Sequence, residues 1–175
     1  MLRQFLILIP LFLFGLMNAQ DKIFWDKNHK LDWADFKSKY QPGTSNAAAT
    51  TFCGISYLLN SSTKKFTSRQ VKIESFFIPS KSWAHLEYRT DLILMHEQSH
   101  FDIAELFARR FRKLISDKMM DAKTLQKFYT GIYDDYKDYQ QDYETVTNHG
   151  RIREKQLEYS AKIDAEIEKL SDFKT

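Results

Sequence analysis

The sequence predicts an α+β fold in which short antiparallel strands, paired as a hairpin, are followed by three helices. Apolar and polar residues alternate between positions 48 and 77, a period of two that is typical of strands with one buried face. From about position 88 onward, apolar residues recur every three or four positions, which indicates amphipathic helices. Because the strands precede the helices along the chain, their order favours an α+β arrangement.

Residues 1–19 are expected to be a secretory signal peptide, which leaves residues 20–175 as a single domain. Arg3 supplies a basic start, an apolar run over positions 5–17 follows, and Ala19 is a small residue at the expected cleavage point. The apolar run is shorter than the roughly 20 residues that a membrane-spanning helix needs. We therefore expect an exported protein, periplasmic or secreted, with no stable membrane span after cleavage.

The composition is that of an ordinary globular domain, with 43% hydrophobic and 28% charged residues and a net charge of +3. Basic side chains are interspersed with acidic ones and form no block, so no nucleic-acid partner is expected. Cys53 is the only cysteine, which excludes an internal disulfide and leaves a hydrophobic core to hold the domain. We interpret Cys53 as a small hydrophobic residue in a strand, not as a nucleophile.

The strand region begins with a short strand and a turn within residues 21–40, whose Trp and Phe side chains are expected to pack on the core. Residues 41–46 have the composition of a loop. Residues 48–60 and 69–77 are predicted to be two strands of a hairpin, and Pro79 ends the second. The 69–77 strand leads toward the helices and is expected to offer an edge to an extended peptide.

Three helices are predicted, over residues 88–117, 122–147 and 152–170, and Gly150 is expected to end the second. The buried stripe expected on the middle helix comprises Leu125, Tyr129, Ile132, Tyr136, Tyr139, Tyr143 and Val146. A tyrosine stripe at helical spacing is more typical of a core than of a catalytic site. If these tyrosines were exposed, the helix could instead be a surface for a protein partner.

Residues 96–100 read His-Glu-Gln-Ser-His within the first predicted helix. Two histidines four positions apart lie one above the other on a helix face, so both imidazoles can reach one tetrahedral zinc ion. His96 and His100 share that face with apolar residues and are expected to point inward, where the alternative is a pair of structural core histidines. Glu97 lies about 100° further around the helix, where a general base for a zinc-bound water belongs.

A catalytic zinc ion has three protein ligands and one position for water. His149 is the preferred third ligand, because Gly150 indicates that the helix stops near Thr147 and lets His149 turn inward. Glu144 is the alternative third ligand, and on an unbroken helix the two side chains could not reach one metal. The non-functional interpretations are a helix-capping role for His149 and a solvated charge for Glu144.

Three further acidic or aromatic residues lie near these segments. Tyr143 is a candidate for stabilising an oxyanion. Asp102 could orient a ligating histidine, although an exposed position is the preferred interpretation. Glu105 lies about 180° around the helix from His96, so it is excluded as a ligand.

Several segments follow one combined pattern along the chain. They are Trp33-Ala-Asp-Phe36, Ala48-Ala-Ala-Thr-Thr51, Ser82-Trp83, His96-Glu-Gln-Ser-His-Phe-Asp-Ile-Ala-Glu-Leu-Phe-Ala-Arg109, and Tyr143-Glu-x-x-Thr147-Asn-His149-Gly150 with Gln156. Together they resemble a bacterial family of predicted secreted zinc-dependent proteases, which is also filed as a domain of unknown function. The resemblance implies a zincin-like domain with His96 and His100 as metal ligands and Glu97 as catalytic acid/base. Glu144 stands where an Asp would be expected, which weakens its case as a ligand.

The sequence therefore predicts a zinc metallopeptidase that acts on a peptide or protein substrate. In this mechanism Zn²⁺ lowers the pKa of its bound water to about 7, and Glu97 takes the proton as hydroxide attacks the scissile carbonyl. The alternative is a non-catalytic exported protein in which the histidine cluster is a structural metal site. Four protein ligands in a closed site would favour that alternative, whereas a water-accessible cleft would favour catalysis.

Overall fold

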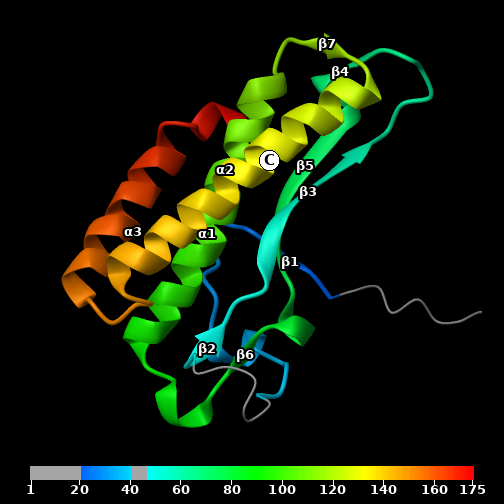
Figure 1. Cartoon of the computed structure of the whole chain (residues 1–175). Helices are drawn as coiled ribbons and strands as arrows, with labels where there is room; N and C mark the ends of the chain where they lie inside the picture. Colours follow the sequence, from blue (N-terminus) through cyan, green and yellow to red (C-terminus); the bar gives the residue numbers. More distant parts are fainter. Residues whose placement is uncertain (1–20, 41–46) are drawn as a thin grey trace, which may run out of the picture.

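The structure, a computed structural model, describes residues 21–40 and 47–175. The expected signal peptide, residues 1–19, and the expected loop, residues 41–46, lie outside the described residues. The strands lie along one side of the helices, which confirms the predicted α+β order (Figure 1). Among the described helices, none combines the length and apolar character that crossing a bilayer requires.

The main sheet is antiparallel and has the order β1 (Ile23–Phe24), β5 (Val71–Phe77), β3 (Cys53–Leu59). β3 and β5 pair along their whole length, which confirms the predicted hairpin. The outer edge of β5 pairs with β1 at Phe76 and Phe77, and the guanidinium of Arg112 donates to the carbonyl of Ile73. The prediction that this strand offers a free edge to a peptide is therefore wrong.

The segment predicted as one strand over residues 48–60 is divided in two. Its first part, β2 (Ala49–Thr50), leaves the main sheet and pairs with β6 (Trp83–Ala84). Between β2 and β3, the backbone N–H of Phe52 donates to the hydroxyl of Ser82 at 2.9 Å, and its carbonyl accepts from the N–H of Ile78 at 2.8 Å. These bonds turn the chain, and β2 lies near the start of the first helix (Figure 1).

A third strand pair closes the opposite end of the molecule, where β4 (Phe66–Thr67) pairs with β7 (Met119–Met120). In the sequence, β4 lies between the two strands of the hairpin, and β7 lies between α1 and α2. Figure 1 shows β4 and β7 side by side at one end of the molecule. Phe66 and Met120 are both buried, so this pair joins the two halves of the fold through apolar contact as well as through backbone hydrogen bonds.

The helices are α1 (Asp91–Ile115), α2 (Ala122–Thr147) and α3 (Arg153–Glu168). α2 has the predicted bounds, because Asp121 caps its first turn and Asn148 adopts the left-handed conformation directly after Thr147. α1 begins three residues later than predicted, since Thr90 caps its first turn by accepting from the N–H of Ile93 at 3.3 Å. Each predicted helix is therefore confirmed, with small differences at the ends of α1 and α3.

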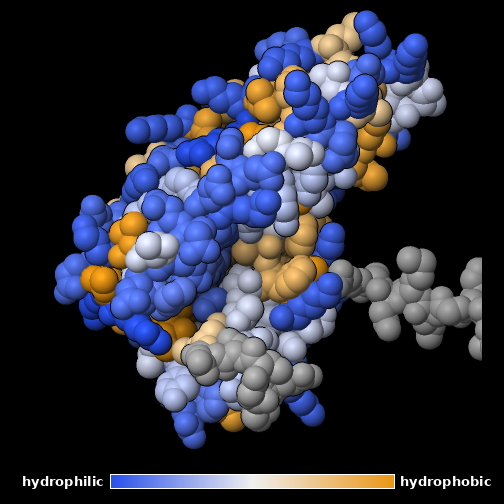
Figure 2. Space-filling model, viewed as in Figure 1, coloured by the Kyte–Doolittle hydropathy of each residue, from blue (hydrophilic) through white to orange (hydrophobic). Residues whose placement is uncertain are grey.

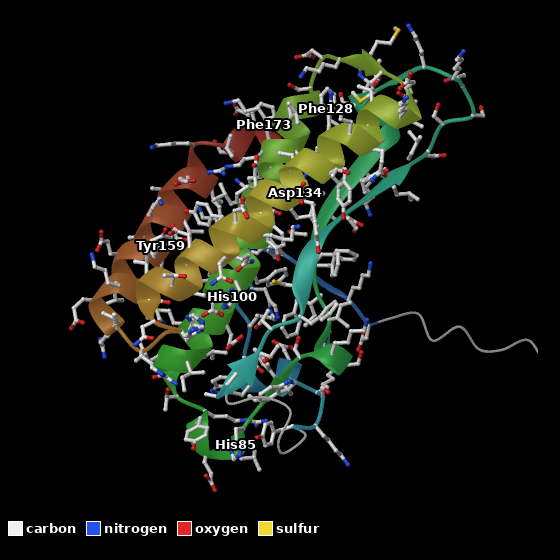
Figure 3. All side chains as sticks on the ribbon, viewed as in Figure 1. His85, His100, Phe128, Asp134, Tyr159 and Phe173 are labelled. Atoms are coloured by element: carbon white, nitrogen blue, oxygen red, sulfur yellow. The ribbon has the colours of Figure 1, made fainter. Side chains whose placement is uncertain are left out.

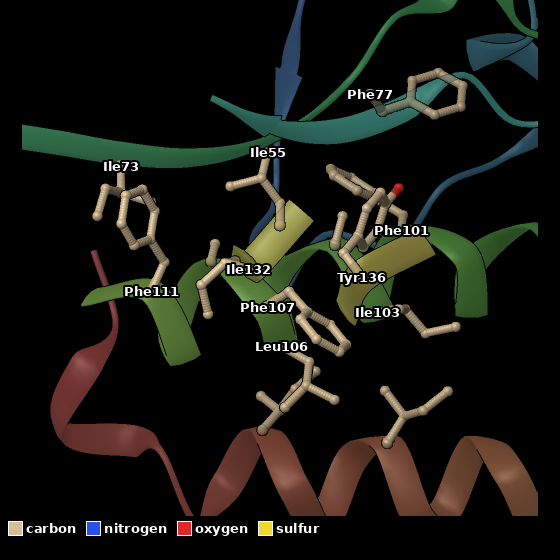
Figure 4. Close-up of a cluster of buried hydrophobic side chains, with 14 of the residues drawn as sticks. Ile55, Ile73, Phe77, Phe101, Ile103, Leu106, Phe107, Phe111, Ile132 and Tyr136 are labelled. Carbon is tan, nitrogen blue, oxygen red and sulfur yellow. The ribbon is translucent and has the colours of Figure 1, made fainter. Parts of the chain in front are cut away.

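α1 lies in the middle of the fold, between the strands on one side and α2 and α3 on the other. Figure 4 shows its apolar side chains meeting the strands above and α3 below. The fully buried members of this core on α1 are Phe101, Ile103, Ala104, Leu106, Phe107, Ala108, Phe111 and Ile115. Because α1 has neighbours on several sides, many of its polar side chains in the middle of the helix are buried as well. Helical periodicity alone does not reveal this.

Glu105 illustrates this enclosure. It points away from the histidine pair, as expected, and it is buried beneath β5 rather than in solvent. Its Oε1 accepts from Arg109 Nε at 2.8 Å and from Arg112 Nη1 at 3.1 Å, and its Oε2 accepts from Ser75 Oγ at 2.6 Å. Both carboxylate oxygens are thus paired, which is the condition under which a buried charge is tolerated.

Candidate metal centre

The crossing of α1 and α2 brings two imidazoles and one carboxylate together. Nε2 of His96 and Nε2 of His100 are 3.1 Å apart. Glu144, on α2, lies against both: its Oε1 is 3.2 Å from His100 Nε2, and its Oε2 is 3.4 Å from His96 Nε2. Figure 3 places His100 where the two helices meet. The three donor atoms lie within 4.8 Å of one another, so this group could hold a metal ion.

His149 lies outside this group, although the sequence favoured it over Glu144 as the third donor. α2 ends at Thr147 as expected, but the side chain of His149 is 66% exposed at the rim of the site. Its Nδ1 lies 2.9 Å from Oε2 of Glu144, so it contacts the carboxylate rather than the histidine pair. The backbone conformation is the reason: Asn148 and His149 both have positive φ, which carries the chain outward past the end of α2.

Gln140 is a site residue that the sequence reasoning missed. Its Oε1 lies 2.5 Å from His100 Nδ1, and its Nε2 donates to the backbone carbonyl of His100 at 2.9 Å. With Nδ1–H donating to Gln140, Nε2 is the ring nitrogen of His100 that remains to bind a metal beside Glu144. A signal was present, because Gln140 and Glu144 are four apart on α2 and therefore share one helix face.

Tyr143 forms the inner wall of the cluster. Its ring stacks on His96 with centroids 4.9 Å apart and meets the edge of His100 at 5.2 Å. The residue is fully buried and does not line the pocket described below, and burial raises the pKa of its phenol well above the usual range. The position of Tyr143 therefore fits a structural role, in which its ring holds the two imidazoles in place, better than the predicted contact with an oxyanion.

Asp102 was expected to be exposed, and it is buried. Its carboxylate accepts from Trp25 Nε1 at 2.6 Å, from Gln98 Nε2 at 2.8 Å and from Lys30 Nζ at 3.2 Å. These bonds tie the first described segment of the chain to α1. The carboxylate is thus engaged on the far side of α1 by partners other than the histidines, and this placement does not support the predicted role of orienting a ligand.

The charges at the site favour a cation. Burial opposes protonation of His100, but hydrogen bonding to Glu144 and the nearby charge of Glu97 outweigh it and raise the pKa of His100 above its ordinary value. Burial likewise opposes ionisation of Glu144, yet His100 and His96 lower the pKa of its carboxyl far below the usual range. Glu144 and Glu97 therefore stabilise positive charge at His100, where a divalent ion can replace a proton.

The donor group forms part of the wall of a pocket of about 630 Å³. Residues 47–51, including β2, line one side, while Gln140, Glu144 and residues 149–151 line the other. Figure 2 shows the surface hollowed between α2 and the strands, with a hydrophobic patch on the strand side. Glu97 is only 4% exposed and also lines this pocket, next to His96 in the helix. The predicted base and the donor group thus face one common space.

Comparison with known proteins identifies a family for the chain. A family model described as a bacterial protein of unknown function (DUF922) matches residues 28–150, which include the histidine pair, Glu144 and His149. No curated protein and no solved structure matches this chain. Since the match covers more than half of the sequence, the chain belongs to this bacterial family of unknown function, DUF922.

Proposed function

We propose that the protein is a zinc-dependent hydrolase, and specifically a metallopeptidase. The observation that carries the proposal is the clustering of two imidazoles and one carboxylate within 4.8 Å, beside a pocket that Glu97 also lines. Two histidines and a glutamate are a known ligand set for catalytic zinc. Oε2 of Glu144 is buried, and its close neighbours are the ring nitrogens of His149 and His96, at 2.9 and 3.4 Å, so a bound ion would give this carboxylate a cationic partner.

Each residue of the site has a defined task in this proposal. His96, His100 and Glu144 would hold the ion, and Gln140 keeps Nε2 of His100 directed at it. Zinc, when bound, supplies a water with a pKa near 7 and a positive charge for the carbonyl oxygen. The carboxylate of Glu97, which lines the same pocket, would take a proton from that water and return it to the leaving amine.

An open site supports catalysis over a purely structural metal. A structural zinc site is closed by four protein donors, whereas the group among the described residues contains three and borders a pocket. His149 contacts Glu144 from the rim and does not close the group. The non-catalytic alternative would gain support if His149 completed a four-donor shell in the metal-bound protein.

The pocket wall supports a peptide as substrate. Residues 47–51 read Ala-Ala-Ala-Thr-Thr, and these small side chains let another backbone approach closely. One edge of β2 pairs with β6, and next to it the carbonyl of Ala48 accepts from the N–H of His85 at 2.8 Å. β2 also lines the pocket, beside α1. An extended peptide along this wall would use main-chain hydrogen bonds, which tolerate many sequences. This wall replaces β5 as the surface proposed for the substrate.

The decisive experiment replaces Glu97 with Gln and measures bound zinc and cleavage of a mixed peptide library in parallel. We expect zinc to remain bound and hydrolysis to fall about 10²- to 10⁴-fold, because the proton acceptor is lost while the donors remain. His96→Ala should lose both zinc and hydrolysis, and Glu158→Gln, at an exposed position on α3, should change neither. Undiminished cleavage by Glu97→Gln would defeat the mechanism.

Export is part of the same proposal, and it is supported by the pattern of residues 1–19. Cell fractionation should find the protein in the periplasm or the medium, and sequencing of its amino terminus should find Gln20 first. Recovery of the uncleaved chain from the cytoplasm would contradict this.

A further inference from the structure

The two histidines of the cluster differ in how their second ring nitrogens are supported. Nδ1 of His100 lies 2.5 Å from Oε1 of Gln140. Nδ1 of His96 is buried and has no hydrogen-bond partner among the described residues. A histidine that binds metal through one ring nitrogen almost always donates the N–H of the other to an acceptor. The cluster therefore needs an acceptor near Nδ1 of His96.

Gln156, on α3, carries a matching unpaired atom. The residue is completely buried, and its Oε1 has no hydrogen-bond partner among the described residues. Its Nε2 donates at 2.7 Å to the backbone carbonyl of Leu92, one turn before His96 on α1. Gln140 is held in the same way, since its Nε2 donates to the carbonyl of His100. Each glutamine thus fixes its amide nitrogen on α1 and leaves its oxygen for an imidazole.

The two unpaired atoms both lie next to Gly150. A Cβ built on this glycine would lie 3.0 Å from His96 Nδ1 and 3.2 Å from Gln156 Oε1. Both atoms therefore border the same small space, which is left by the missing side chain. The Cβ would also lie 2.9 Å from Cγ of His96, so any larger residue would push the imidazole out of position. The positive φ of 73° at Gly150 further favours glycine at this turn.

We propose that Gln156 is the positioning residue for His96: its Oε1 accepts the Nδ1–H, so that Nε2 of His96 is held toward Glu144 and the metal. Movement of the two side chains into the space beside Gly150 would pair two buried polar atoms that have no other hydrogen-bond partner among the described residues. α3 then becomes part of the metal centre, and the two ligating histidines have equivalent glutamine supports. The inference rests on the proposed metal site and is independent of whether that site hydrolyses peptides.

The test measures the binding of zinc ion alone and the ¹⁵N and ¹H resonances of the histidine rings. In the wild type with zinc bound, we expect His96 to carry a slowly exchanging proton on Nδ1 that shows a nuclear Overhauser contact to the Gln156 side chain. Gln156→Met, which removes the acceptor at similar volume, should weaken zinc binding about 10- to 100-fold and make that proton exchange faster. Gln156→Glu, which restores an acceptor, should recover both properties.

Controls separate positioning from general destabilisation. Gln141→Met, at an exposed position on α2, should leave zinc affinity unchanged, and thermal unfolding of each metal-free variant reports any loss of fold. Unchanged affinity in Gln156→Met, or a zinc-loaded wild type in which His96 carries its proton on Nε2, would overturn the inference while leaving the proposed function intact. The wild-type resonances decide the matter even if Gln156→Met fails to fold. A wild type that binds no zinc would overturn the proposed function and this inference together.

Discussion

Replacing Glu144 and His149 separately by Ala distinguishes the third metal donor from its neighbour. The two oxygens of Glu144 lie 3.2 and 3.4 Å from the Nε2 atoms of the histidine pair, whereas His149 reaches only Glu144, at 2.9 Å. Loss of an outer partner of a ligand costs about 10- to 100-fold in metal affinity, or about 1.4 to 2.7 kcal/mol. His149→Ala should fall within that range. Glu144→Ala should exceed it, because a charged donor is removed from a group of three.

Competition between the protein and a zinc-binding dye at neutral pH measures both affinities, and the double variant completes a thermodynamic cycle. If His149 acts only through Glu144, the double variant should bind zinc no more weakly than Glu144→Ala alone. Melting curves of the metal-free variants serve as the control for folding. Retention of zinc by Glu144→Ala, together with its loss from His149→Ala, would refute the assignment and reinstate the histidine that the sequence favoured.

Three other measurements test the charges and the core. The metal-free protein should be most stable between pH 4.5 and 6.5, the ordinary pKa values of Glu and His. The pKa of His100 is raised in the folded protein, so the stability that this group contributes is lost as the pH rises through that pKa. The pKa of Glu144 is lowered, so its contribution is lost as the pH falls through that pKa. Melting temperatures across pH check this, and a flat profile in the wild type would contradict it. Glu105→Ala should cost about 3 to 5 kcal/mol in urea unfolding, because it leaves Arg109 buried without its carboxylate partner. Burial raises the pKa of Cys53 to about 12. Mass spectrometry should therefore show that the thiol is alkylated slowly in the folded protein at mildly alkaline pH and quickly after unfolding. Rapid labelling of the folded protein would count against this.

The predicted features that hold are those that depend on short stretches of chain. The bounds of α2 follow from its periodicity, from a capping Asp121 and from residues after Thr147 that tolerate the left-handed conformation. The inward direction of His96 and His100 follows from their four-residue spacing beside apolar neighbours. These properties depend on residues within one or two helical turns, so the local sequence is sufficient to predict them.

The features that were missed depend on which elements become neighbours. Asp102 was expected to be exposed, and the direction of Glu105 on the helix left its surroundings open. α1 is enclosed by strands and by two helices, and both carboxylates are buried with partners. The strand over residues 48–60 breaks at Phe52, whose N–H donates to the hydroxyl of Ser82, a residue distant in the sequence. Periodicity reports one buried face and does not reveal an element with neighbours on several sides.

The sequence by itself determined that two imidazoles one turn apart face the interior with a carboxylate beside them, because helix geometry alone fixes those directions. Only the tertiary structure decided which further groups meet them. The crossing of α2 over α1 brings Glu144 and Gln140 to the histidines, and the turn after Thr147 carries His149 to the rim. A crossing angle is set by side-chain packing between helices far apart in the chain, and no local pattern encodes it.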